Sequence, residues 1–459
     1  MIKFDKKDYN SLLEEIYCKF PSFQIVGERA LKLGLENMLT LDSSLGNPSQ
    51  AMKCVHIAGT NGKGSVSSMI ASAFMECGLK VGLYTSPHLT DFRERIKING
   101  EMVPQEWVYD FLKTRYELFE STGASFFEIT TAMAFSYFAE QQVDIAVIEC
   151  GLGGRLDSTN IITPLVSIIT NIGFDHCQYL GNTLDAIARE KAGIIKPKVP
   201  VVIGERVQEN NEPFESIALQ RDSAIYFAED LYLTELSDIY AVANRILSLI
   251  DSEKMDLKGN CQQKNIRTAA TSLAMLLQSA ETMQLLKDHK YTADKACRRF
   301  VKGIENAAKN TKLRGRWETL SKRPLVICDI GHNEHGMKLL MPQIKSTYNS
   351  LCGTSRFYMV FGVMKDKDLM AELPLLPKEA EYLWVNASTE RAMPAEELAD
   401  KMKINGFNGK IIAQGMVAET LQYLLKIAAR KDFIFIGGSS YVVAEALKYF
   451  DTKKAETKK

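Results

Sequence analysis

Residues 52–68 read MKCVHIAGTNGKGSVSS, and this stretch decides the fold prediction. Its apolar start, 52–58, is typical of a buried strand, and SVSSMIASAFMEC (65–77) predicts a helix that ends at Gly78. The glycines between them allow backbone N–H groups to turn toward an anion, and the helix start adds partial positive charge. The stretch therefore predicts a phosphate-binding loop between a strand and a helix of an α/β fold.

The loop differs from the standard phosphate-binding pattern G-x-x-x-x-G-K-[ST]. Lys63 is followed by Gly64, and the hydroxyl comes one residue late, at Ser65. We expect Lys63 to reach the β- and γ-phosphates, and Ser65 either to cap the helix or to approach a metal. The predicted nucleotide contacts are Gly59, Thr60, Asn61, Gly62, Lys63, Gly64 and Ser65. The alternative is a plain glycine-rich turn with Ser65 as the helix N-cap.

The alternation of apolar strand, turn and helix continues on both sides of this loop. Further strands are predicted at 79–85, 143–150 and 164–171, and Asn99-Gly100 predicts a hairpin within 95–103. A second series follows at 325–330, 356–362, 382–387, 410–415 and 432–438. The chain has 459 residues, more than one hydrophobic core of about 250–300 residues can organise.

We therefore predict two α/β domains. Residues 1–302 would form an ATP-binding domain with a mostly parallel sheet covered by helices on both faces. Residues 303–312, GIENAAKNTK, would form a linker, because no helical apolar stripe is evident there. Residues 313–459 would form a smaller Rossmann-like domain.

Composition and charge exclude several classes of protein. Lys plus Arg equals Asp plus Glu at 56 each. The chain therefore lacks the excess of positive charge that is typical of nucleic-acid-binding proteins. No apolar run approaches the ~18 residues that a membrane span needs, and the N-terminus has no apolar signal segment. The nine cysteines include no C-x-x-C pair, so no zinc site is indicated. We expect a cytoplasmic protein.

Three polar residues stand at the carboxyl ends of predicted strands, where ligands bind in open parallel sheets. They are Ser86, Glu149 and His176. A carboxylate after the apolar run 143–148 is costly to bury alone, so a cation is expected near Glu149. Ser86 could instead be a turn residue before Pro87. His176 could be a hydrogen-bonded loop histidine, because Mg²⁺ prefers oxygen ligands.

Nine motifs in order cover nearly the whole chain and carry a family resemblance. They are LGLENM (33–38), HIAGTNGKGS (56–65), GLYTSPHLTDFRERI (82–96), FFEITTAMAF (126–135), IECGLGGRLDSTN (148–160), ITNIGFDH (169–176), REKAGIIK (189–196), DIGHN (329–333) and FGVMKDKD (361–368). With them the chain resembles the folylpolyglutamate synthase and dihydrofolate synthase family of the Mur ligase superfamily. TSPHL followed by DFRERI favours this branch over ligases of cell-wall precursors.

The resemblance implies an ATP-dependent amide ligase. ATP would phosphorylate a carboxylate of dihydropteroate or folate, and the amine of L-glutamate would attack the acyl phosphate. It implies small-molecule substrates only, a monomer, and two Mg²⁺ ions with Ser86, Glu149 and His176 as metal residues. The catalytic set would be Lys63, Glu149, His176 and Lys191, the last carbamylated to help hold the second ion. The alternative for Lys191 is a cation that complements its helix C-terminus.

The resemblance also implies the remaining contacts. Asn265, Arg316, Asp329 and His332 would bind ATP, although Cys261 stands where the family often has histidine. Phe127 and Asp157 would hold the pterin, by stacking and by accepting hydrogen bonds. Phe127 could equally be a core residue, Asp157 a cap, and Arg316 an interdomain ion-pair residue.

Two other classes of function compete with the ligase. A nucleotide switch should carry a standard Walker loop and an N-K-x-D segment, and neither occurs. A relative that binds folate without turnover is disfavoured, because Lys63, Glu149, His176 and Lys191 are all present.

Overall fold

The computed structural model describes residues 5–20, 34–206, 211–232, 237–351, 353–365, 369–370 and 372–457. Leu33 of LGLENM and residues 366–368 of FGVMKDKD lie outside these ranges. The chain forms two compact units. The first comprises Met1–His88, Phe92–Asp256 and Gln262–Leu313, and the second comprises Leu89–Asp91, Leu257–Cys261 and Arg314–Lys459. No described helix is long and apolar enough to span a membrane.

The first unit is built on an eight-stranded sheet of order β4-β3-β2-β5-β1-β6-β7-β8. Six neighbouring strands are parallel, and the hairpin of β3 and β4 adds an antiparallel edge. Asn99 and Gly100 turn this hairpin with positive φ, as predicted. The bounds are β1 Cys54–Ala58, β2 Val81–Tyr84, β3 Ile96–Ile98, β4 Glu101–Met102, β5 Ile145–Glu149, β6 Val166–Ile169, β7 Val201–Ile203 and β8 Ile225–Phe227.

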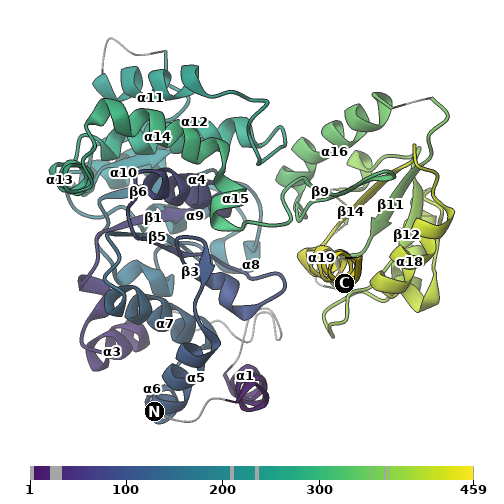
Figure 1. The fold of residues 1–459 in the computed structure, drawn as a ribbon, viewed down its shortest axis with the longest axis horizontal. Coiled ribbons are helices and arrows are strands. Elements are labelled where there is room, and N and C mark those ends of the chain that lie inside the picture. The colour runs from purple at the N-terminus through teal and green to yellow at the C-terminus, as the bar shows by residue number, and fades with distance from the viewer. Residues whose placement is uncertain are drawn as a thin grey trace. The chain divides into compact units, whose positions relative to one another are not determined.

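Helices cover both faces of this sheet, which explains its continuous apolar strands. On one face lie α4 (Lys63–Glu76), α12 (Gln262–Leu276) and, packed on α4, α14 (Ala293–Glu305). The other face carries α7 (Phe126–Glu140) and α9 (Leu184–Ala192), as Figure 1 shows for α7 and α14. Around them pack α1 Lys6–Lys19, α3 Glu36–Ser44, α5 Gln105–Thr114, α6 Tyr116–Thr122, α8 Cys177–Leu180, α10 Asn211–Gln220, α11 Asp238–Leu249, α13 Ala280–Asp288 and α15 Ala307–Thr311.

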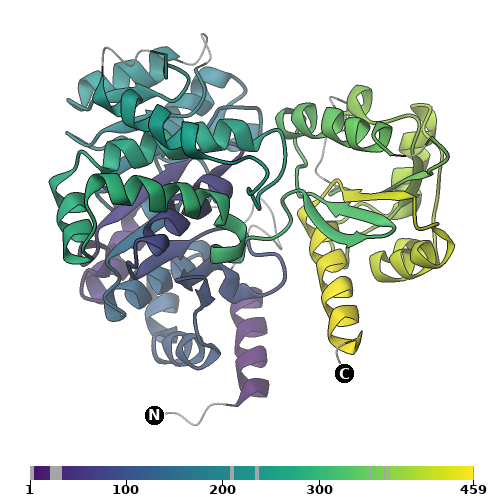
Figure 2. The same ribbon diagram turned by 45° about the horizontal axis from the view of Figure 1, so that its top comes forward.

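The second unit has a six-stranded sheet of order β13-β12-β11-β14-β10-β9 between two helical layers (Figures 1 and 2). Helices α16 (Glu334–Asn349) and α17 (Ala395–Ile404) cover one face, and α18 (Val417–Ile427) and α19 (Ser440–Thr457) cover the other. The strands are β9 Glu318–Lys322, β10 Leu325–Cys328, β11 Phe357–Phe361, β12 Glu381–Trp384, β13 Gly409–Lys410 and β14 Phe433–Gly437. Only β9 runs antiparallel, and the predicted strand at 410–415 is reduced to β13 and a 3₁₀ turn.

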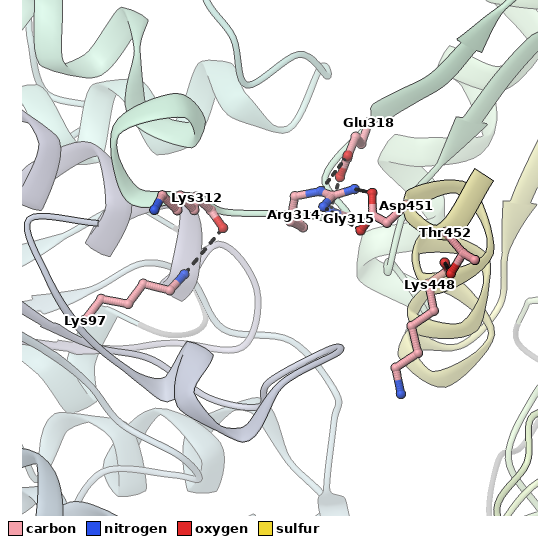
Figure 3. Close-up of polar contacts among 8 residues, drawn as sticks. All are labelled: Lys97, Lys312, Arg314, Gly315, Glu318, Lys448, Asp451 and Thr452. Carbon is pink, nitrogen blue, oxygen red and sulfur yellow. Dashed lines mark hydrogen bonds and ion pairs between the residues drawn. The ribbon is translucent and has the colours of Figure 1, made fainter. Parts of the chain in front are cut away.

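Residues 303–312 are not a linker, contrary to the prediction. They complete α14 and form α15, and Gly303 lies so close to α4 that an added Cβ would be 2.4 Å from the Cα of Ala73. Lys97 Nζ donates to the carbonyl of Thr311 at 3.0 Å. It also donates to the carbonyl of Lys312 at 3.4 Å, a contact that Figure 3 shows. The chain passes into the second unit directly at Leu313 and Arg314.

Arg314 is anchored within the second unit as soon as the chain enters it. Its Nε donates to Glu318 at 2.7 Å and its Nη1 to Asp451 of α19 at 3.2 Å (Figure 3). Because hydrogen bonds hold the backbone just before Leu313 and the side chain just after it, the passage between the units is very short.

Candidate active site

The glycine-rich loop follows β1 and opens α4. Gly59 has φ 146° and Gly62 has φ 82°, backbone angles that residues with a Cβ rarely adopt. Gly62 is the N-cap and α4 begins at Lys63. The expectation that Ser65 caps the helix is therefore wrong, because Ser65 lies inside the first turn and is 1% exposed.

Neighbouring side chains leave no room for a Cβ at these glycines. A Cβ on Gly59 would lie 1.8 Å from the hydroxyl of Thr170, and one on Gly62 would lie 2.3 Å from Oδ1 of Asn265. The loop is thus closely packed between the end of β6 and the start of α12. Its backbone N–H groups at the start of α4 are suited to an anion.

The side-chain nitrogens of two lysines converge on one carbonyl of the loop. Lys63 Nζ donates to the carbonyl of Gly59 at 3.0 Å and to that of Thr60 at 3.2 Å. Lys191 Nζ also donates to the carbonyl of Gly59 at 3.0 Å. The loop therefore holds both lysine side chains close to its backbone.

Helix α9 presents Lys191 to the loop and not to solvent. Thr183 caps the helix through Ala186 N at 3.2 Å and Gly193 ends it, as predicted. Lys191 is 3% exposed. Burial, and next the charge of Lys63, lower its pKa from 10.5 to about 7. A large fraction of this amine is therefore neutral near pH 7, which a surface lysine at a helix C-terminus would not be.

The predicted metal residues Ser86 and Glu149 do lie together. Glu149 ends β5 and is 4% exposed, and its Oε2 accepts the backbone N–H of Ser86, which follows β2, at 3.3 Å. Strands β2 and β5 are neighbours, so the sheet order brings the two residues to the same edge.

His176 lies on the loop that follows β6. It adopts φ 51°, caps α8, and its Nε2 lies 3.8 Å from Oδ1 of Asp175. Its side chain is about one-third exposed. The loop belongs to the same carboxyl edge of the sheet, since β6 is the other neighbour of β1.

The donor set fits a hard cation that keeps several waters. Among the described residues, no three His, Cys, Asp or Glu side chains are arranged around a common metal position. A zinc-type site is thus not indicated within the described ranges. Mg²⁺ characteristically takes one or two protein oxygens with waters and phosphate oxygens, and Glu149 with Ser86 offers such oxygens beside the loop.

The start of α12 contacts the loop through amide side chains. Asn265 Nδ2 donates to Oε1 of Gln262 at 2.8 Å, and Gln262 Nε2 donates to Oγ of Ser65 at 3.5 Å. The structure therefore brings Asn265 and Ser65 together around Gly62, as expected for one nucleotide site.

Phe127 lies over the segment that follows Glu149. It is partly exposed, unlike its neighbour Phe126, which is 2% exposed in the core. A Cβ on Gly151 would lie 2.4 Å from Cζ of Phe127, and the ring centroid is 6.1 Å from that of Tyr84. The Phe127 ring therefore lies directly against the glycine-rich segment 151–154.

Asp157 is buried and bound by its own segment. It caps a 3₁₀ turn, accepting from the N–H of Leu152 at 2.8 Å and from the N–H of Thr159 at 3.0 Å. The hydroxyl of Thr159 donates to it as well. Burial raises its pKa. The capping alternative is thus realised, and any pterin contact would be additional to it.

Sequence reasoning assigned no role to His56, which extends this network to β1. Its Nε2 lies 2.8 Å from Oγ1 of Thr159 and 3.1 Å from Sγ of Cys150. Burial lowers its pKa to about 3, so it is neutral, and because Thr159 donates to Asp157, His56 Nε2 must donate to Thr159. The network ties the strand of the loop to the segment after Glu149.

In the second unit, Asp329 follows β10 and organises its surroundings. Its carboxylate accepts from the N–H of Trp317 and of Gly331, each at 2.7 Å. Burial raises its pKa, while the nearby charge of Arg316 opposes this. His332 is exposed, and its Nδ1 lies 3.0 Å from the carbonyl of Ile330. The predicted residues Arg316, Asp329 and His332 thus gather around the end of one strand.

Comparison with known proteins identifies both units. A profile described as "Mur ligase middle domain" matches residues 57–273. A profile described as "Mur ligase, glutamate ligase domain" matches residues 315–440. The first includes the glycine-rich loop, Glu149, His176 and Lys191, and the second includes Arg316, Asp329 and His332.

Full-length relatives agree with these profiles. The dihydrofolate synthase/folylpolyglutamate synthase of Buchnera aphidicola subsp. Schizaphis graminum is 30% identical, covering 98% of this chain and 95% of that protein. The protein of the same name from Bacillus subtilis is 31% identical over 91% and 95%. A structure of E. coli FolC in complex with DHPP and ADP superposes with a TM-score of 0.74 at 25% identity, covering 97% and 98%. The chain therefore belongs to the dihydrofolate synthase/folylpolyglutamate synthase family of Mur ligases, which are ATP-dependent ligases.

Proposed function

We propose that this protein joins L-glutamate to dihydropteroate, to the γ-carboxylate of (tetrahydro)folate, or to both, with release of ADP and phosphate. ATP would phosphorylate the acceptor carboxylate, and the glutamate amine would displace phosphate from the acyl phosphate. The names of the relatives support both substrates. An assay with each acceptor in turn distinguishes the dihydropteroate reaction from the folate reaction. It also distinguishes both from the reaction of another Mur-type ligase, which would use neither acceptor.

The convergence of Lys63 and Lys191 on the loop, with Glu149 buried at the neighbouring strand end, carries this proposal. In an ATP complex, Lys63 would exchange the Gly59 carbonyl for phosphate oxygens and balance charge during phosphoryl transfer. Glu149, Ser86 and His176 would hold Mg²⁺, which would supply positive charge to neutralise the phosphates. We propose two such ions.

Lys191 is proposed to act as a carbamate. The neutral amine attacks CO₂, an N–C bond forms as one C=O π bond opens to a carboxylate oxygen, and one proton leaves. The neutral side chain thereby becomes an anion that would help hold the second Mg²⁺. The lowered pKa supports this step, because the neutral amine is abundant near pH 7.

Asn265, which approaches the loop from α12, would contact the nucleotide. Arg316, Asp329 and His332, which gather around the end of β10 in the second unit, are proposed as nucleotide-binding residues. Phe127, partly exposed beside Gly151, would stack on the pterin. Asp157 would accept from the pterin, in place of a hydrogen bond within its own segment.

The test is glutamate-dependent ADP release by the purified chain. One arm contains dihydropteroate and a second contains reduced folate, each with and without L-glutamate. Activity in both arms establishes both reactions, and activity in only one assigns the chain to that reaction. No glutamate-dependent ADP in either arm refutes the proposal.

A further inference from the structure

The segment after β6 holds the backbone of the glycine-rich loop. Thr60 N–H donates to the carbonyl of Asn171 at 3.0 Å, and Asn61 N–H donates to Oδ1 of the same residue at 2.9 Å. Thr170 Oγ1 donates to the carbonyl of Asn61 at 2.6 Å. Asn171 therefore accepts two consecutive N–H groups in the first half of the loop.

The orientation of the Asn171 amide is fixed from its other side. Its Nδ2 donates to Oε1 of Glu205 at 3.0 Å. The two ends of an amide have nearly the same shape, but only the oxygen can accept the Asn61 N–H. Because a carboxylate can only accept, Glu205 requires the NH₂ on its own side and so directs the oxygen to the loop.

A third residue fixes the carboxylate in turn. Lys264 Nζ forms an ion pair with Oε2 of Glu205, whose side chain is 7% exposed. Glu205 follows β7, the neighbour of β6. The preceding Gly204 permits the close approach, since a Cβ there would lie 2.2 Å from the carbonyl of Thr170.

We propose that Glu205 is a positioning residue for nucleotide binding, acting on the loop through Asn171, with Lys264 as its counter-ion. The chain of contacts runs from α12 through β7 and β6 to the loop. This role goes beyond the proposed function, and it depends only on the loop binding the phosphates of a nucleotide.

The Glu205→Gln variant separates positioning from packing. Beside the Lys264 ammonium, the new side chain turns its oxygen to the cation and its NH₂ to Asn171. Two NH₂ groups then face each other, and the Asn171 amide turns over and presents NH₂ to the Asn61 N–H. In the double variant Glu205→Gln/Lys264→Met the cation is gone, so the glutamine oxygen can face Asn171 and restore the original orientation.

The measurement is the Kd of Mg-ADP by titration calorimetry, with the melting temperature of each variant recorded. We expect Glu205→Gln to weaken binding about tenfold, because a loop N–H loses its acceptor. Lys264→Met alone should stay within about twofold of the wild type, and the double variant within about threefold. Steady-state kinetics should show the KM for ATP rising in the single variant while the KM for glutamate stays constant.

Recovery in the double variant distinguishes this proposal from general destabilisation. A double variant that binds Mg-ADP as weakly as Glu205→Gln would overturn it, as would wild-type affinity in Glu205→Gln. If Glu205→Gln does not fold, Asn171→Ser tests the same contact. The Asn171→Ser variant should bind Mg-ADP more weakly by a similar factor. Adding Lys264→Met to it should not restore the affinity. A wild-type chain that binds Mg-ADP but forms no glutamyl product would refute the proposed function and leave this inference standing.

Discussion

Glu149 shows how one side chain can be assigned from its place on a strand. A carboxylate that ends a buried strand, 4% exposed, needs a compensating positive charge. Glu149→Gln keeps the shape and removes the charge. We expect kcat to fall at least ~100-fold, because the variant would lose the carboxylate that we propose to hold Mg²⁺. ADP release measured with saturating ATP and glutamate checks this.

Asp42→Asn is the matched control for Glu149→Gln. Asp42 is also 4% exposed, but it accepts from the N–H and hydroxyl of Ser49 within its own segment. Its variant should lose stability and keep kcat. Equal turnover in Glu149→Gln and the wild type would contradict the metal role of Glu149.

Lys191 gives a prediction that depends on pH. Its pKa is lowered to about 7, so the neutral amine that reacts with CO₂ becomes abundant as the pH rises through about 7. An ordinary lysine with a pKa of 10.5 would remain protonated there. We expect a carbamate signal with ¹³C-bicarbonate by NMR that grows between about pH 6 and 8 and is absent from Lys191→Met. No Lys191-dependent signal at pH 8 with Mg-ADP would refute carbamylation.

At the scale of elements, the glycine-rich loop can be tested with a pair of glycines. Gly62 has φ 82° and faces Asn265, whereas Gly46 has φ 84° and no atom within 4 Å of an added Cβ. Alanine at either position should cost about 1–2 kcal/mol of unfolding free energy from the backbone alone. Only Gly62→Ala should also weaken Mg-ADP binding, since only there must the surroundings move. Equal affinities in the two variants would show that the loop tolerates displacement.

The sequence predicted β1, β2, β5, β6 and the β3–β4 hairpin of the first sheet, but it missed β7 and β8 and details that depend on packing. Continuous apolar runs identify β1, β2, β5 and β6, because such runs suit strands covered on both faces. The polar edge strand β9 carries no such run. The linker prediction failed because the buried residues of 303–311 include only one large apolar side chain, Ile304, beside Gly303, Ala307 and Thr311.

Candidate site residues could be predicted where polar side chains follow apolar strands. Residues that contact them from distant parts of the sequence could not. Ser86 and Glu149 meet because β2 and β5 are neighbours, an order that no sequence pattern states. Asn171 stood inside a recognised motif, yet its partner Glu205 comes 34 residues later. His56 opens the recognised loop motif, but its contact with Thr159 joins residues 103 positions apart, and no sequence pattern indicates that pairing.

At the scale of the whole molecule, Lys97 binds the backbone just before the chain enters the second unit at Arg314. Burial lowers its pKa from 10.5 to about 8. Between those values the unfolded chain binds one proton more than the folded chain, so this residue makes stability rise with pH across that window. Lys97→Met should remove that component of the rise. Denaturant unfolding of both proteins at pH 7.5, 9 and 10 measures the difference, and parallel profiles would contradict the assignment.

The Gly59 carbonyl has a consequence for the thermodynamics of nucleotide binding. It accepts hydrogen bonds from the side-chain nitrogens of Lys63 and Lys191, so contacts within the fold order both side chains. Ordering a lysine side chain costs up to about 2 kcal/mol of conformational entropy, and here that loss occurs when the chain folds. An arriving nucleotide exchanges one acceptor for another and immobilises little further. Its affinity should therefore depend less on side-chain ordering than on displacement of water, with a correspondingly small entropic penalty.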